Sequence, residues 1–126
     1  MRFVQSDFLA VVPGGSWPEA FSGIVANPPY IPYQILTAEQ RNDLSSRRWC
    51  IDGIGGRASL WDYFIAHAVS FLGCGGRMAW VLPGAFLQAD YAKLIGNYLA
   101  ASFERTAAII LRERIFMVRS STSPGC

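Results

Sequence analysis

The chain of 126 residues is long enough to bury one hydrophobic core, and its 52% hydrophobic and 16% charged residues exclude overall disorder. The net charge of +2 is too small to indicate a nucleic-acid-binding surface by itself. Because the sequence contains no run of about 18 apolar residues, no membrane span is expected. The three scattered cysteines indicate reduced thiols in a cytoplasmic protein.

The first part of the chain is expected to alternate short apolar segments with loops. Residues 2–12 form an apolar segment that turns at Asp7, and a loop with a capped turn over 16–20 follows. Residues 24–26 then form a short strand that is apolar on both sides, as in the interior of a parallel sheet.

Residues 31–59 are mostly polar and are expected to be irregular, apart from a helix over 37–44 that Thr37 caps. A loop of this length inside a compact domain is usually functional or mobile.

The second part of the chain is expected to alternate helices and strands. The predicted elements are a helix over 59–72 stopped by Gly73, Gly75 and Gly76, a strand over 77–82, a helix over 90–101 and a strand over 106–111. The buried face of the first helix is expected to consist of Leu60, Phe64, His67, Ala68 and Phe71, with Trp61, Ile65 and Leu72 beside it. This alternation predicts an α/β domain with a mostly parallel sheet.

The motif Asn27-Pro28-Pro29-Tyr30 follows the first predicted strand directly. In open α/β sheets, ligands bind outside the carboxyl ends of the strands. Pro28 restricts Asn27 to extended conformations, and neither proline has an N–H to donate. The motif is therefore expected to be a stiff loop that offers carbonyl acceptors, an amide side chain and an aromatic ring.

Such a loop suits a planar substrate that carries an NH₂ group. The Asn27 side-chain oxygen and the Pro28 carbonyl each accept one hydrogen from that nitrogen, which frees its lone pair for attack, while Tyr30 stacks on the ring. This chemistry needs no activated serine or cysteine and no metal, and the sequence has no metal-ligand spacing. The simpler interpretation is a turn that follows a strand.

The sequence resembles the S-adenosylmethionine (SAM)-dependent amino-group methyltransferases, and more narrowly the N6-adenine DNA methyltransferases of restriction–modification systems. The resemblance runs over about residues 4–118. It is carried by Asp7-Phe8, which is similar to the acidic cofactor loop, by the catalytic motif Asn27–Tyr30, and by residues 60–72 and 75–83, which are similar to the next helix and strand.

The resemblance implies a partial Rossmann-like methyltransferase sheet with flanking helices. It implies that Asn27, Pro28, Pro29 and Tyr30 are catalytic and that Asp7, Phe8 and Asn27 bind SAM, the Asp7 carboxylate taking the amino group of the cofactor's adenine. The implied partner is double-stranded DNA, whose target adenine is flipped out of the duplex and enters the pocket at Tyr30.

Residues 1–119 are expected to form a partial catalytic domain with the irregular insert 31–59, and residues 120–126 a disordered tail. The glycine-rich SAM loop and the target-recognition domain of the resembling enzymes have no counterpart in these 126 residues. The isolated chain is therefore expected to be a fragment without activity of its own.

Two other functions stay open on the residues alone. A protein-glutamine N5-methyltransferase uses the same four residues, because a carboxamide NH₂ poses the same lone-pair problem; the long polar stretch 31–59 favours DNA. The other alternative is a non-catalytic remnant. Arg47, Arg48 and Arg57 are expected either to contact phosphates near a flipped base or to be solvated, and His67 is expected to be structural.

Overall fold

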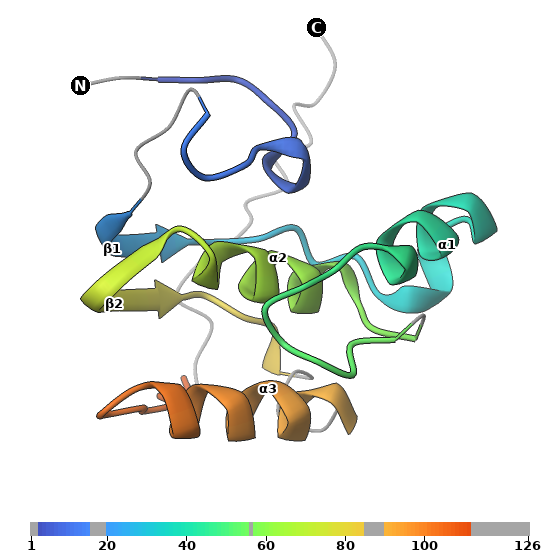
Figure 1. Ribbon diagram of the computed structural model, residues 1–126. Coiled ribbons are helices and arrows are strands. Elements are labelled where there is room, and N and C mark those ends of the chain that lie inside the picture. The colour runs from blue at the N-terminus through green and yellow to red at the C-terminus, as the bar shows by residue number, and fades with distance from the viewer. Residues whose placement is uncertain (1–2, 16–19, 56, 85–89, 112–126) are drawn as a thin grey trace, which may run out of the picture.

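The computed structural model describes residues 3–15, 20–55, 57–84 and 90–111. Its elements in chain order are η1 (Phe8–Ala10), β1 (Phe21–Ala26), η2 (Tyr33–Ile35), α1 (Ala38–Ser46), α2 (Leu60–Val69), β2 (Leu72–Trp80) and α3 (Asp90–Ser102). Figure 1 shows α2 lying along the pair of strands, with η1 on one side and α3 on the other. The predicted α/β class is confirmed.

The sheet of the described residues is a parallel pair, β1 beside β2, in which Ile24 lies opposite Met78 and Ala26 opposite Trp80. The strand predicted over 24–26 is confirmed and begins earlier. Its predicted place in a sheet interior is wrong for these residues, because Val25 is 86% exposed. The described residues leave the Val25 side chain almost entirely uncovered.

The connection from α2 to β2 differs from the prediction. The helix ends at Val69 rather than at residue 72, and the strand begins at Leu72 rather than at residue 77. The glycines therefore lie inside β2, where the pairing shifts between Leu72 and Arg77. Gly75 has a φ of 72°, a conformation that glycine adopts without steric cost, so the glycine run permits an irregularity in the strand.

The start of α1 follows the predicted capping pattern. The Thr37 Oγ1 accepts a hydrogen bond from the Gln40 N–H (3.2 Å), and the Gln40 Oε1 accepts one from the Thr37 N–H (2.9 Å). This reciprocal pair satisfies two backbone donors that the helix itself leaves without partners. The helix continues to Ser46, slightly beyond the predicted end.

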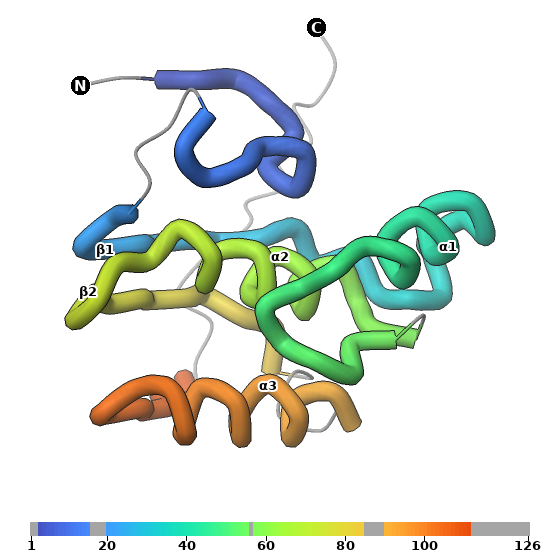
Figure 2. Tube along the Cα trace, viewed as in Figure 1, coloured from blue at the N-terminus to red at the C-terminus, as the bar shows by residue number. Residues whose placement is uncertain are grey.

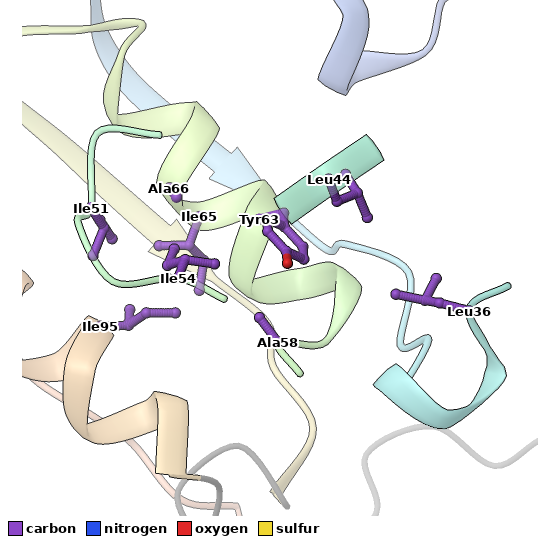
Figure 3. Packing of buried hydrophobic residues seen from close by; sticks show 9 residues of the cluster. All are labelled: Leu36, Leu44, Ile51, Ile54, Ala58, Tyr63, Ile65, Ala66 and Ile95. Atoms are coloured by element: carbon purple, nitrogen blue, oxygen red, sulfur yellow. The ribbon is translucent and has the colours of Figure 1, made fainter. Parts of the chain in front are cut away.

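The core surrounds α2 on more sides than a single predicted face. Tyr63 and Ala66 are fully buried, whereas Leu60, Phe64 and His67 of the predicted face are only half-buried. The reason is that α3, η1 and the segment 31–59 all pack near this helix. The cluster drawn in Figure 3 consists of Leu36, Leu44, Ile51, Ile54, Ala58, Tyr63, Ile65, Ala66 and Ile95.

The segment 31–59 is thus part of the core despite its polar composition. It contains η2 and α1 and supplies Leu36, Leu44, Ile51 and Ile54 to the buried cluster. The tube in Figure 2 shows it leaving the end of β1, passing through α1 and returning to the start of α2. A segment packed in this way can hold the loop after β1 in place.

The strand predicted over 106–111 is wrong. Residues 103–111 form no strand, and Ile109, Ile110 and Leu111 are 86%, 70% and 64% exposed. Their apolar side chains suggested a strand, but no described residue pairs with them, and a strand requires a hydrogen-bonded neighbour. The turn predicted over 16–20 lies, except for Ala20, outside the described residues, as does the tail 120–126.

Candidate active site

The Asn27–Tyr30 loop leaves the carboxyl end of β1, where the sequence placed it. Pro28 is buried, while Asn27 and Pro29 are exposed and Tyr30 is 45% exposed. Among the described residues, no hydrogen-bond partner of the Asn27 side chain is found. Its carboxamide is therefore free to accept a hydrogen bond from a ligand, and the Tyr30 side chain is partly exposed.

The loop is held at both ends. The Tyr30 hydroxyl donates to the Val81 carbonyl oxygen (3.1 Å), and the Val81 N–H donates to the Ala26 carbonyl oxygen (3.0 Å). On the other side, the Leu60 N–H donates to the Ile31 carbonyl oxygen (3.0 Å). These bonds join the residues on either side of the motif to the end of β2 and to the first turn of α2.

Asp62 organises that first turn. Its Oδ2 accepts a hydrogen bond from the Ser59 N–H (2.8 Å), while its buried Oδ1 has no partner. The residue is 1% exposed, and burial raises the pKa of its carboxyl from 3.8 to about 6, against the lowering effect of the Ser59 bond. The sequence reasoning missed Asp62, although the Ser59-x-x-Asp62 spacing is a capping signal.

Asp7 and Phe8 have different surroundings. Asp7 is exposed, and its Oδ1 accepts a hydrogen bond from the Leu9 N–H (3.0 Å), which caps η1. The Phe8 ring lies in an aromatic cluster, with its centroid 5.4 Å from that of Phe64 and 5.0 Å from that of His67. Phe8 thus fixes the acidic turn against α2, while the second carboxylate oxygen of Asp7 remains available.

A cavity of about 460 Å³ is lined by Asp7 and by Ile31, the residue that follows the motif. Its lining includes Asp7, Ile31, Leu60 and Phe64, so it lies between η1, the residue after Tyr30 and the start of α2. None of Asn27, Pro28, Pro29 and Tyr30 lines it. The structure therefore places the acidic turn beside the far end of the loop, but it does not place Asp7 and Asn27 in one cavity.

The arginines and the histidine differ in their hydrogen bonds and exposure. Arg47 forms an ion pair with Asp43 (2.5 Å) and donates to the Leu9 carbonyl oxygen (2.9 Å), whereas Arg48 and Arg57 are exposed. The Nε2 of His67 lies 2.8 Å from the Val11 carbonyl oxygen, and its ring packs among aromatic rings. The structural role predicted for His67 is confirmed.

Over residues 3–15, 20–55, 57–84 and 90–111, no three side chains of the histidine, cysteine and acidic types gather as metal ligands would. The same residues contain no helix with the length and apolar character that crossing a bilayer requires.

Comparison with known proteins agrees with the motif. Residues 3–116 match the family model described as Eco57I restriction-modification methylase. Over 87 residues the chain is 29% identical to the Type II methyltransferase M.AccI of Acinetobacter calcoaceticus, a match that covers 68% of this chain and 16% of that protein. No solved structure matches. The predicted resemblance to restriction–modification methyltransferases is confirmed, and the chain belongs to the Eco57I restriction-modification methylase family.

Proposed function

We propose that this chain carries the substrate-amino-group side of an active site that methylates the N6 of adenine in DNA with SAM as the methyl donor. The observation that carries the proposal is the exposed Asn27 carboxamide, which has no hydrogen-bond partner among the described residues, followed three residues later by the partly exposed Tyr30. Both lie in a loop whose two ends are hydrogen-bonded to the neighbouring elements. Such a loop is pre-organised for a flat ring with an NH₂ group.

In the proposed reaction, the Asn27 side-chain oxygen and the Pro28 carbonyl accept the two hydrogens of the adenine amino group. The nitrogen lone pair is then no longer delocalised into the ring and points at the electrophile. When bound, the cofactor would supply an activated methyl group, so that a C–N bond would form as the C–S bond of the cofactor broke. The surplus proton leaves the methylated nitrogen for solvent, while Tyr30 holds the plane of the base by stacking.

The cavity at Asp7 fits the adenine end of SAM in its chemistry. Ile31, Leu60 and Phe64 offer apolar surface to a purine ring, and the free oxygen of Asp7 offers an acceptor for its amino group. The polar side of the cavity is lined by Gln40, Asp43 and Arg47. Phe8 acts in this proposal by holding the Asp7 turn in place. Asn27 is proposed to serve both sides, because a bound cofactor would deliver its methyl group to the nitrogen that Asn27 orients.

We further propose that the DNA partner presents its target adenine flipped out of the duplex, since a base inside the stack is out of reach of this loop. Family membership favours DNA over a glutamine side chain as the acceptor. The chain spans 16% of the length of M.AccI, so sequence recognition is assigned to the whole protein. Residues 1–119 are proposed as the part that belongs to the catalytic domain.

The test is methyl transfer from radiolabelled SAM to three acceptors: adenine-containing duplex DNA, the same DNA with an unpaired adenine, and a glutamine-bearing release factor. Nucleosides from the digested DNA are separated by chromatography. The proposal predicts label in N6-methyl-2′-deoxyadenosine, with more label from the DNA that carries the unpaired adenine. Label in the release factor alone would support the glutamine enzyme. Label in no acceptor, together with no SAM binding by calorimetry, would support the non-catalytic remnant.

A further inference from the structure

We propose that Asp62 is a positioning residue for the Asn27–Tyr30 loop, acting through the first turn of α2. The proposal deepens the proposed function, on which its catalytic part rests. Within the described residues, no hydrogen bond joins Asp62 to Asn27 or Tyr30. Asp62 is linked to the loop through two consecutive backbone amides at the start of α2. Asp62 binds the Ser59 N–H, and the Leu60 N–H binds the residue that follows the loop.

The first step of this route is the cap. The Oδ2 of Asp62 accepts the Ser59 N–H at 2.8 Å, which fixes the backbone where the chain enters α2. The next residue, Leu60, donates its own N–H to the Ile31 carbonyl oxygen at 3.0 Å. The Ser59 N–H and the Leu60 N–H lie in adjacent, planar peptide units that meet at the Ser59 Cα, so the orientation of the Leu60 N–H depends on the held Ser59 N–H through the two backbone dihedrals of Ser59.

The second step is the loop itself. Ile31 directly follows Tyr30, so the bond from Leu60 fixes the downstream end of the motif. The upstream end is fixed independently, because the Val81 N–H binds the Ala26 carbonyl oxygen. The Tyr30 hydroxyl bonds to the same residue, Val81. Loss of the Leu60 bond would therefore leave the motif attached at β2 alone, free to pivot about that end.

The burial of Asp62 indicates more than ordinary helix capping. An exposed residue caps a helix equally well, as Thr37 does for α1. Asp62 is instead 1% exposed, with one oxygen lacking a partner, and burial raises the pKa of its carboxyl. A buried acceptor without a partner destabilises the fold. Because Asp62 is buried, the packing around its side chain fixes the position of the Oδ2 that accepts the Ser59 N–H.

Amide hydrogen exchange on the 126-residue protein tests this route without requiring activity. Asp62→Ala deletes the acceptor, and Asp62→Asn keeps a side-chain oxygen for the Ser59 N–H. Thr37→Ala is the matched control, because it removes the cap of a helix that does not bind the loop. The reference amides are Arg41, which donates to Thr37, and Phe103, which donates to Leu99. If Asp62→Ala does not fold, Asp62→Leu, which keeps the side-chain volume but has no acceptor, takes its place as the variant without a cap.

Asp62→Ala is expected to speed exchange of the Leu60 N–H about tenfold while Arg41 and Phe103 keep their wild-type rates. Asp62→Asn is expected to restore Leu60 to within about twofold, and Thr37→Ala to affect Arg41 alone. Equal acceleration at all three amides would show a merely structural role and overturn the proposal, as would an unchanged Leu60. Where the wild type transfers methyl groups, kcat should fall about tenfold in Asp62→Ala, with the Kd for SAM within twofold. A wild type that neither transfers methyl groups nor binds SAM overturns the proposed function, and the exchange rates then still decide the route.

Discussion

Replacing Asp62 with asparagine removes a buried titrating carboxyl and should remove part of the pH dependence of folding. The folded-state pKa of Asp62 is about 6, raised by burial, whereas an unfolded aspartate titrates near 4. Between these two values the folded protein binds the proton more tightly than the unfolded chain does. Stability contributed by this group is therefore greatest at low pH and is lost as the pH rises from about 4 to about 6.

The size of this effect follows from the two pKa values. A tenfold change in proton affinity corresponds to about 1.4 kcal/mol, so complete ionisation of Asp62 lowers the free energy of unfolding by at most about 3 kcal/mol. Residual solvent screening and the Ser59 hydrogen bond make the true value smaller. Asparagine keeps an oxygen for the Ser59 N–H but does not titrate. The free energy of unfolding of Asp62→Asn therefore does not fall through ionisation at residue 62.

Urea unfolding of both proteins at several pH values between about 4 and 7.5 measures this difference. Other carboxylates titrate in both proteins and cancel in the comparison when they are distant from residue 62. The stability of the wild type relative to Asp62→Asn should fall as the pH rises and level off above about 7. Parallel profiles over the whole range would refute a raised pKa for Asp62 and weaken the argument built on its burial.

Two further predictions concern the core and the loop. Ile95→Ala should lower the free energy of unfolding by about 2–5 kcal/mol, because Ile95 is fully buried in the cluster that joins α3 to α2. The control Ile109→Ala, at an 86% exposed position, should change the free energy of unfolding by less than about 0.5 kcal/mol. Equal losses in a denaturant titration would contradict this placement of the core. Tyr30→Ala should weaken binding of an unpaired adenine by about 1–3 kcal/mol, while Tyr30→Phe, which loses only the bond to Val81, should weaken it by no more than about 1 kcal/mol. A larger loss in Tyr30→Phe than in Tyr30→Ala, measured by fluorescence titration, would exclude stacking as the main contact.

Local patterns predicted the features of this chain that depend on local chemistry. The Asn27–Tyr30 loop lies after β1, and Thr37 caps α1, because proline geometry and capping act over a few residues. The parallel direction of β1 and β2 also followed from the alternation of strands and helices.

Features that depend on neighbours in space were predicted less well. Residues 106–111 have the composition of a strand but no partner among the described residues. Tyr63 and Ala66 are buried because elements distant in the sequence cover α2 on more than one side, which helical periodicity cannot indicate. Asp62 escaped notice because its importance comes from its burial, and an aspartate in a first helical turn is ordinarily exposed.

The most direct test of the proposed site is methyl transfer to adenine by Asn27→Ala, measured beside SAM binding. The matched control is Asn97→Ala, which removes an exposed carboxamide from α3. The account predicts that Asn27→Ala forms at least about a hundredfold less N6-methyladenine than the wild type, since amino-group orientation is lost. It also predicts a Kd for SAM within about threefold of the wild-type value, while Asn97→Ala retains both properties. Transfer by Asn27→Ala at a rate close to that of the wild type would contradict the central role given to the Asn27–Tyr30 loop.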